Sequence, residues 1–282
     1  MNTISKWLVM IFLALPIGFA WGEDISPEKP LVVGVVPYNS TRMLLRAYQP
    51  MREYLERALG RHVTFYSASG FKAFQQNTEQ GDFDLVITPA HFARILEKEK
   101  GYIPLVRYSG GARGLVMVKH GSDLKNIQDL RGKAVAVPDR LSLASILCIE
   151  YLRSKGLRAD MDFRVLEVPS FNSAVLAVQH DEADAAVSAP GALAQMTEGL
   201  RDSMRVLADT GEYINLVFMA QPRLGQGYAE RLKTELLRFG TGAEGKNFLA
   251  RTGFGSIVAF MPGDLRPLDP YVAETKKLLG RP

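Results

Sequence analysis

Short polar side chains gather at turns that each precede a helix-like segment of the chain. The first N–H groups of a helix have no partner within the helix and carry a partial positive charge. Several helix starts that face one space would therefore bind an anion without a cofactor. The sequence predicts such a site, and its candidate ligand-binding residues are Tyr38, Ser40, Thr41, Ser69, Phe71, Thr88, His91, Arg113, Arg140, Ser142, Phe171, Asn172 and Ser188.

Each of these residues also has a structural interpretation. Ser, Thr and Asn at helix starts commonly cap the helix, which stabilises it by about 1 kcal/mol. Phe71, Phe92 and Phe171 would either pack in a core or form an apolar wall for a ligand with an organic body. Arg113 stands between glycines and suits a carboxylate or phosphonate, with Arg42 and Arg140 as weaker candidates, but it also fits a solvated loop charge.

Residue patterns for catalysis or metal binding do not appear. The four histidines, His62, His91, His120 and His180, lack metal-ligand spacing, and the single cysteine, Cys148, lies in an apolar stretch. The chain has no nucleophile elbow, phosphate loop or dinucleotide motif. We expect no metal, no cofactor and no enzymatic activity. The alternative is a periplasmic enzyme with the same fold. A nucleophile or an acid–base pair in the site would support that alternative.

The N-terminus has the pattern of a secretory signal peptide. Lys6 precedes an apolar run that ends near Phe19, and Ala20-Trp21-Gly22 is a small-x-small cleavage pattern. We expect residues 1–22 to be removed and the protein to reside in the periplasm; an uncleaved membrane anchor is the alternative. Without Lys6 the formal charge falls from +4 to +3, and it has no long basic run, so we expect no nucleic-acid partner.

Strand-like and helix-like segments alternate along the chain, which predicts an α/β fold with mostly parallel sheets. The strand-like runs are 31–36, 63–66, 85–88, 115–118, 134–137, 164–168 and 185–188. The helix-like segments are 51–59, 71–80, 90–98, 142–155, 173–180, 228–238 and 245–251, with Gly60, Gly101 and Gly156 as stops.

One spacing occurs twice. Phe71 precedes Asp84 by 13 residues, and Phe171 precedes Asp184 by 13. A strand-like run that ends in a hydroxyl residue follows each aspartate. We interpret the two halves as repeats, with coincidence as the alternative, and expect both aspartates to organise turns rather than to act as an acid–base pair.

These halves predict two lobes that crossing segments join as a hinge. We expect one lobe to consist of residues 23–114 and 212–282 and the other of residues 115–211, with the last helices packed on the first lobe. Ligands of open α/β sheets bind outside the carboxyl ends of the strands, so the cleft between the lobes is the predicted site.

Motifs along the chain then suggest a family. They are Val-Gly-Val-Val-Pro-Tyr-Asn-Ser at 33–40, Tyr-Gln-Pro-Met-Arg-Glu-Tyr-Leu-Glu at 48–56, Gly-Asp-Phe-Asp-Leu at 81–85 and Leu-Arg-Gly-Lys at 130–133, followed by Ala-Val-Leu-Ala-Val at 174–178 and Gly-Ala-Glu-Gly-Lys at 242–246. In this order and spacing the chain resembles the phosphate/phosphite/phosphonate family of ABC-transporter substrate-binding proteins.

The resemblance implies a type II periplasmic-binding fold, a monomer that closes on a small anion, and an inner-membrane permease as partner. A receptor that signals to a sensor kinase is the alternative. The family's ligand loop falls on 142–145, where Ser142 matches. Its ligand histidine and tyrosine fall near Phe171-Asn172 and Phe71, so the resemblance implies the transport role and leaves the ligand open.

Overall fold

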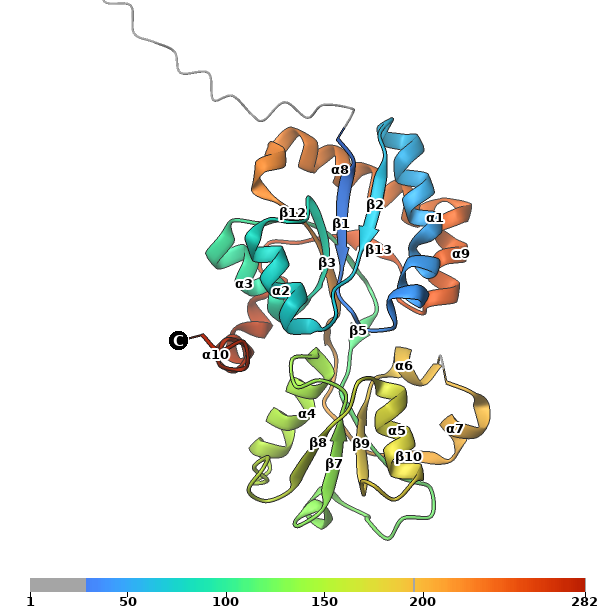
Figure 1. The fold of residues 1–282 in the computed structure, drawn as a ribbon, viewed down its shortest axis with the longest axis vertical. Helices are drawn as coiled ribbons and strands as arrows, with labels where there is room; N and C mark the ends of the chain where they lie inside the picture. The colour runs from blue at the N-terminus through green and yellow to red at the C-terminus, as the bar shows by residue number, and fades with distance from the viewer. Residues whose placement is uncertain (1–28, 195, 282) are drawn as a thin grey trace, which may run out of the picture.

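The computed structural model describes residues 29–194 and 196–281, so the predicted signal peptide at 1–22 lies outside the described residues. The chain forms two stacked α/β lobes with a narrow connection between them (Figure 1). Within these described ranges, no helix is long and apolar enough to cross a membrane.

A six-stranded sheet forms the centre of the upper lobe in Figure 1, called lobe 1 here. Its first part comes from the start of the chain, and two strands come from the part after residue 215. In spatial order the strands are β13 (Ile257–Ala259), β4 (Ile103–Tyr108), β12 (Leu216–Ala220), β3 (Leu85–Pro89), β1 (Leu31–Val35) and β2 (Val63–Tyr66).

A five-stranded sheet forms the centre of lobe 2, which is one continuous segment of the chain. In spatial order its strands are β10 (Met204–Asp209), β6 (Leu115–Lys119), β9 (Ala185–Ser188), β7 (Ala134–Val137) and β8 (Arg164–Glu167).

Both sheets are mixed, which corrects the expectation of mostly parallel sheets. The triplets β2-β1-β3 and β8-β7-β9 are parallel. The remaining pairings are antiparallel. Strands β6 and β12, which follow the crossings, start at the carboxyl ends of β9 and β3 and run away from the other lobe, so they enter each sheet opposite to the triplet. The α/β class and the two-lobed fold are as predicted.

Helices cover both sides of each sheet. In lobe 1, α1, α8 and α9 pack together on one side, and α2 and α3 lie on the other (Figure 1). The helices of lobe 1 are α1 (Thr41–Leu59), α2 (Phe71–Gln80), α3 (Ala90–Lys100), α8 (Gly225–Thr241), α9 (Ala243–Thr252) and α10 (Asp269–Leu278); those of lobe 2 are α4 (Leu143–Ser154), α5 (Phe171–Gln179), α6 (Pro190–Ala194) and α7 (Glu198–Asp202). Short 3-10 helices occupy Ile127–Leu130, Pro222–Leu224 and Arg266–Leu268.

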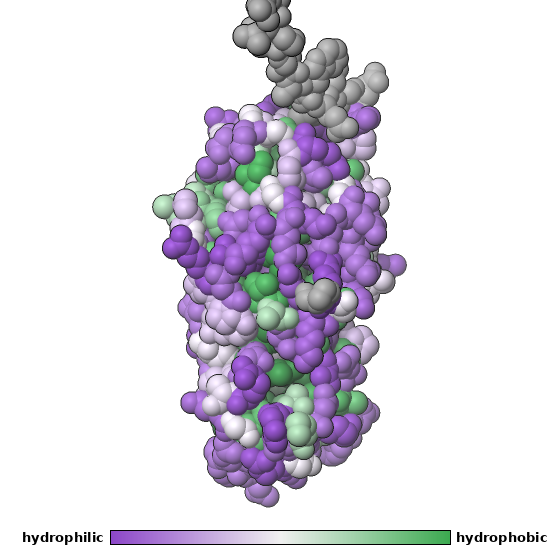
Figure 2. Space-filling model, turned by 90° about the vertical axis from the view of Figure 1, so that its left-hand side faces the viewer, coloured by the Kyte–Doolittle hydropathy of each residue, from purple (hydrophilic) through white to green (hydrophobic). Residues whose placement is uncertain are grey.

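The surface is mainly hydrophilic on the face that Figure 2 shows, with small hydrophobic areas between the polar side chains. Ion pairs at the surface fasten the last helix to lobe 1: Asp269 of α10 binds Arg94 at 2.7 Å and Lys98 at 3.0 Å. Because α8 and α9 pack on α1 as well, the end of the chain belongs to lobe 1.

The two repeats have the same architecture, with a matching aspartate at the same place. Asp84 precedes β3, and its carboxylate accepts the backbone N–H of Val32 in β1 at 2.9 Å. Asp184 precedes β9, and its carboxylate accepts the backbone N–H of Ala134 in β7 at 2.9 Å. In both lobes the aspartate's own N–H donates to the carbonyl of the same partner at 2.8 Å. Both aspartates therefore hold neighbouring parallel strands in register.

The environments of the two aspartates differ, so their replacement should have unequal costs. Asp84 is 9% exposed and also binds Arg223 at 2.8 Å, whereas Asp184 is more exposed and lies 3.4 Å from Lys133. We expect Asp84→Ala to lower the free energy of unfolding by about 3 kcal/mol and Asp184→Ala by about 1 kcal/mol, because the first leaves a buried N–H and a guanidinium unpaired. Urea denaturation measures both. Asp123→Ala, at an exposed carboxylate, is the control, and an equal loss for all three variants would contradict the role.

Two crossings join the lobes and pair with each other. Strand β5 (Gly111–Ala112) on the outgoing segment pairs with β11 (Tyr213–Ile214) on the return. Gly114 follows β5 and packs so closely on α4 that a Cβ there would lie 2.7 Å from the sulfur of Cys148. The crossings thus form a short two-stranded hinge against lobe 2.

The lobes also touch directly through the loop before α4. Leu141, Leu143 and Leu147 of lobe 2 belong to the same cluster of packed buried side chains as the core of lobe 1. His91 of α3 lies fully buried, and its Nε2 is 3.0 Å from the carbonyl oxygen of Leu141. Since a carbonyl only accepts, Nε2 carries the proton and donates it across the lobe boundary.

This buried histidine should make the structure sensitive to acid. Burial lowers the pKa of His91 to about 3, well below its ordinary value near 6.5. The stability that the neutral ring contributes is present above pH 6.5 and is lost as the pH falls toward 3, because the exposed ring binds a proton that the buried ring excludes. Between pH 6.5 and 5, we expect the free energy of unfolding of the wild type to fall by about 2 kcal/mol more than that of His91→Gln.

Urea denaturation at a series of pH values measures this difference. His62→Gln is the matched control, because the side chain of His62 is 90% exposed. A wild-type pH profile that coincides with that of His91→Gln would show that the ring does not exclude a proton.

Candidate functional site

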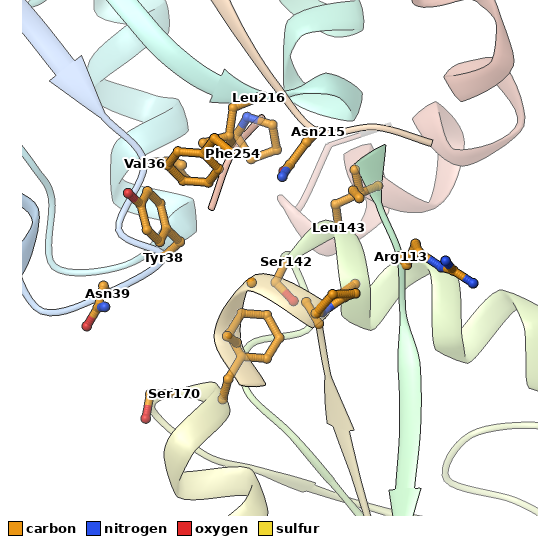
Figure 3. Close-up of a pocket in the computed structure, with 18 of the residues that line it drawn as sticks. Val36, Tyr38, Asn39, Arg113, Ser142, Leu143, Ser170, Asn215, Leu216 and Phe254 are labelled. Atoms are coloured by element: carbon orange, nitrogen blue, oxygen red, sulfur yellow. The ribbon is translucent and has the colours of Figure 1, made fainter. Parts of the chain in front are cut away.

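A cavity of about 480 Å³ lies between the lobes, at the carboxyl ends of the parallel strands. Lobe 1 contributes Val36 and Pro89, which follow or end β1 and β3, and lobe 2 contributes Ala189 after β9. Both crossings reach it through Arg113 and Asn215. Figure 3 shows lobe 1 residues above the space and Ser142 and Ser170 of lobe 2 below it.

The structure brings together about half of the residues predicted from the sequence. They come from both lobes and from one crossing. The predicted residues that line the cavity are Tyr38, Ser40, Phe71, Arg113, Ser142, Phe171 and Asn172.

Three predicted residues that are exposed or partly exposed do not line the cavity. Thr41 and Ser69 are exposed beside helix starts. Arg140 binds the carboxylates of Asp160 and Glu167, both at 2.6 Å. These two acids turn the guanidinium toward another part of lobe 2, so the structure places Arg140 outside the cavity lining.

Thr88, Ser188 and His91 lie buried next to the cavity but do not line it. Thr88, next to the end of β3, and Ser188, at the end of β9, occupy matching positions of the two repeats, and both are 0% exposed. Within residues 29–194 and 196–281, neither hydroxyl has a hydrogen-bond partner. The residues that follow them, Pro89 and Ala189, form the cavity surface instead.

Ser142 caps a helix, which is the structural interpretation given for it in the sequence analysis. Its Oγ accepts the backbone N–H of Ser145 at 3.2 Å and lies 2.6 Å from the Ser145 hydroxyl. Ser170 caps α5 in the same way through Ser173 at 3.1 Å. Ser40 precedes α1 without a side-chain cap. The hydroxyls of Ser142 and Ser170 therefore hold the helix starts in place, and the first residues of α4 and α5 line the cavity.

Arg113 lies on the rim and is engaged by a neighbour. Its guanidinium binds the Asp209 carboxylate, with Nε 3.2 Å from Oδ1. This pair holds the pKa of Asp209 below its ordinary value. Figure 3 shows the guanidinium directed away from the other labelled side chains. The charge of Arg113 is thus neutralised at the edge of the site.

An aromatic stack forms one wall of the cavity. The rings of Tyr38 and Phe254 meet edge to face with centroids 5.6 Å apart, and Phe254 stacks on Tyr108 at 4.4 Å. Burial and the neighbouring Tyr48 raise the pKa of Tyr38 well above its ordinary value, so its hydroxyl stays neutral. Tyr38 therefore offers the cavity a fixed ring.

An acidic side chain already lies at the start of α2. The carboxyl group of Asp139, in lobe 2, is near the backbone N–H of Phe71, which favours its charged form, although partial burial raises the pKa overall. Asp139 has φ 135°, a rare backbone conformation for a side-chain-bearing residue. One helix start at the lobe boundary thus faces a carboxyl group of the protein itself.

Sequence reasoning missed several lining residues, among them Asn215, Met43, Met196 and Phe254. Asn215 is the polar residue between Ile214 and Leu216 in the return crossing, and its amide points toward the cavity in Figure 3. Phe254 stands between two glycines after α9. A polar residue inside an apolar run and an aromatic residue in a glycine loop were the available signals.

Metal-binding clusters of three or more His, Cys, Asp or Glu side chains are absent from the described part of the chain. Cys148 is fully buried in α4, and burial raises the pKa of its thiol. This agrees with its interpretation as a core residue.

The chain is similar to solved solute-binding proteins over most of its length. A binding protein component of an ABC phosphonate transporter from Pseudomonas aeruginosa shares 16% sequence identity, with 88% of each chain covered and a TM-score of 0.78. PhnD1 from Prochlorococcus marinus, in complex with methylphosphonate, shares 15% identity over 91% of this chain and 100% of its own, with a TM-score of 0.76. A Xanthomonas citri protein bound to ATP shares 17% identity over 89% of this chain and 98% of its own, with a TM-score of 0.74.

These structures have the same fold. A family model described as "ABC transporter, phosphonate, periplasmic substrate-binding protein" matches residues 33–265, which include strands of both lobes, both crossings and the residues that line the cavity. The chain therefore belongs to the family of periplasmic substrate-binding proteins of phosphonate ABC transporters.

Proposed function

We propose that the protein captures a small anionic solute in the cavity between its lobes and delivers it to an inner-membrane ABC permease. The observation that carries this proposal is the cavity itself, since helix starts from both lobes and residues from both crossings line it. A solute that touches both lobes stabilises the closed form by its higher affinity for that form. The paired strands β5 and β11 are the proposed hinge.

Binding rather than catalysis suits the side chains around the cavity. Among the lining residues that the structure describes, Tyr38 and Arg113 are the titratable ones. The phenol is held neutral and the guanidinium is paired with Asp209. Neither is poised to act as a general base or a nucleophile.

We also propose the location and the domain limits that follow from this role. Export by the predicted signal peptide would place the mature protein in the periplasm as a monomer. The lobes would comprise residues 23–114 with 212–282, and 115–211. The strand order supports these limits, because the two sheets meet at β5 and β11.

A ligand screen tests the proposal. We expect at least one anion among phosphate, phosphite, phosphonates, sulfonates and carboxylates to raise the melting temperature, since a ligand at 100 times its Kd adds about 2.7 kcal/mol of stability; pyrimidines are included as uncharged compounds. Small-angle X-ray scattering should show a smaller radius of gyration with that solute. A full panel without any shift, or shifts from uncharged compounds alone, would contradict the capture of an anion.

Replacement of the rim arginine separates two contributions to binding. Because the Arg113 guanidinium pairs with Asp209, we expect Arg113→Ala to change the affinity for the tightest solute of that screen by less than about threefold. Asn215→Ala, which removes an amide directed into the cavity, should weaken binding by about tenfold. Isothermal titration calorimetry measures both. The opposite ranking would show that Arg113 turns inward and binds the ligand directly.

A further inference from the structure

Both walls of the cavity are largely apolar, and they differ in their rings and helix starts. Lobe 1 presents apolar surfaces from Val36, Tyr38, Phe71, Leu216 and Phe254. Ring contacts hold this wall in place, because Phe254 lies between Tyr38 and Tyr108 and Phe71 meets Phe92 at 6.4 Å. An apolar ligand surface that packs on this wall would be removed from contact with water, and the protein side chains would not have to move.

The lobe 2 wall is where a charged group would bind. It has apolar lining side chains as well, among them Phe171 and Met196, and it adds the starts of α4 and α5 and the exposed side chain of Asn172. The caps made by Ser142 and Ser170 leave other N–H groups of the first turns unpaired within their helices. A single carboxylate or sulfonate can accept these donors.

A compact double charge does not fit the same surroundings. The one charged side chain among the described lining residues, Arg113, is neutralised by Asp209. The Asp139 carboxyl group, at the lobe boundary, adds negative charge beside the start of α2. Removing a dianion from water is costly unless a charged partner compensates, and the cavity offers it none.

The volume also exceeds the need of a small oxyanion. About 480 Å³ lies within the range of about 300 to 1,000 Å³ that is typical of pockets for drug-sized ligands. A ligand that fills the space has an organic body besides its charged group.

From the proposed role in solute capture, we infer that the ligand is amphipathic. Its apolar body, an aromatic ring or a branched chain, lies against the aromatic wall of lobe 1. Its single carboxylate or sulfonate lies at the starts of α4 and α5 in lobe 2. The contact that closes the lobes is therefore hydrophobic on the lobe 1 side, and on the lobe 2 side it adds hydrogen bonds at the helix starts.

Calorimetric titration with four probes tests this inference. Phenylacetate and benzenesulfonate combine a ring with one charge, and methylphosphonate and inorganic phosphate are compact. We expect phenylacetate or benzenesulfonate to bind at least about tenfold more tightly than both compact anions, and the better of the two identifies the charged group. Compact anions that bind equally well or better would overturn the ligand class while leaving solute capture intact. If none of the four binds at about 10 mM, the inference is also overturned, and the broad screen decides separately whether solutes are captured at all.

Variants of the aromatic wall provide a second readout. Phe254→Ala should lower the affinity for the tighter-binding aromatic probe by about tenfold. Phe260→Ala is the matched control, because Phe260 is also half-buried but does not line the cavity. Met43→Gln, at a lining side chain that is 52% exposed and so tolerant of change, should weaken the same probe by about threefold. Equal affinities for wild type and both cavity variants would place the aromatic probe elsewhere.

Discussion

The direction of six strands determines where the ligand cavity of this protein lies. The triplets β2-β1-β3 and β8-β7-β9 are parallel. The helices that follow the three strands of one triplet therefore all begin at the same edge of that sheet. When the crossings set the two edges face to face, the helix starts meet over one cavity. Asp84 and Asp184 maintain this arrangement, because each ties its strand to the neighbouring one by the same pair of hydrogen bonds.

Much of this arrangement can be predicted from the sequence. The seven predicted strands match observed ones within two residues, and the spacing from Phe71 to Asp84 and from Phe171 to Asp184 identifies the repeat. Both phenylalanines line the cavity. Local patterns succeed here because apolar segments indicate the helices and strands, and glycines indicate where helices end. Gly60 and Gly101, for example, end their helices with φ of 67° and 66°.

Other features depend on contacts that a local pattern does not contain. Helix α1 begins at Thr41 and continues through Pro50, whereas the predicted helix covered only 51–59. Strands β4 and β12 escaped prediction and pair antiparallel to each other in the centre of the lobe 1 sheet. Among the site residues, the charges of Arg113 and Arg140 are taken by acids distant in the sequence, and His91 is buried by a loop of the other lobe. Only tertiary structure brings these partners together.

The shared packing of Leu141, Leu143 and Leu147 with the core of lobe 1 has a consequence for how the protein works as a receptor. Separation of the lobes would expose these leucines to water, at about 25 cal/mol for each Å² of apolar surface. Closure thus has a driving force of its own, and a bound solute adds to it. The unliganded population then includes closed molecules, and a membrane partner that recognised shape alone would also engage empty ones. Selective delivery therefore requires the partner to sense the occupied state through more than the angle between the lobes.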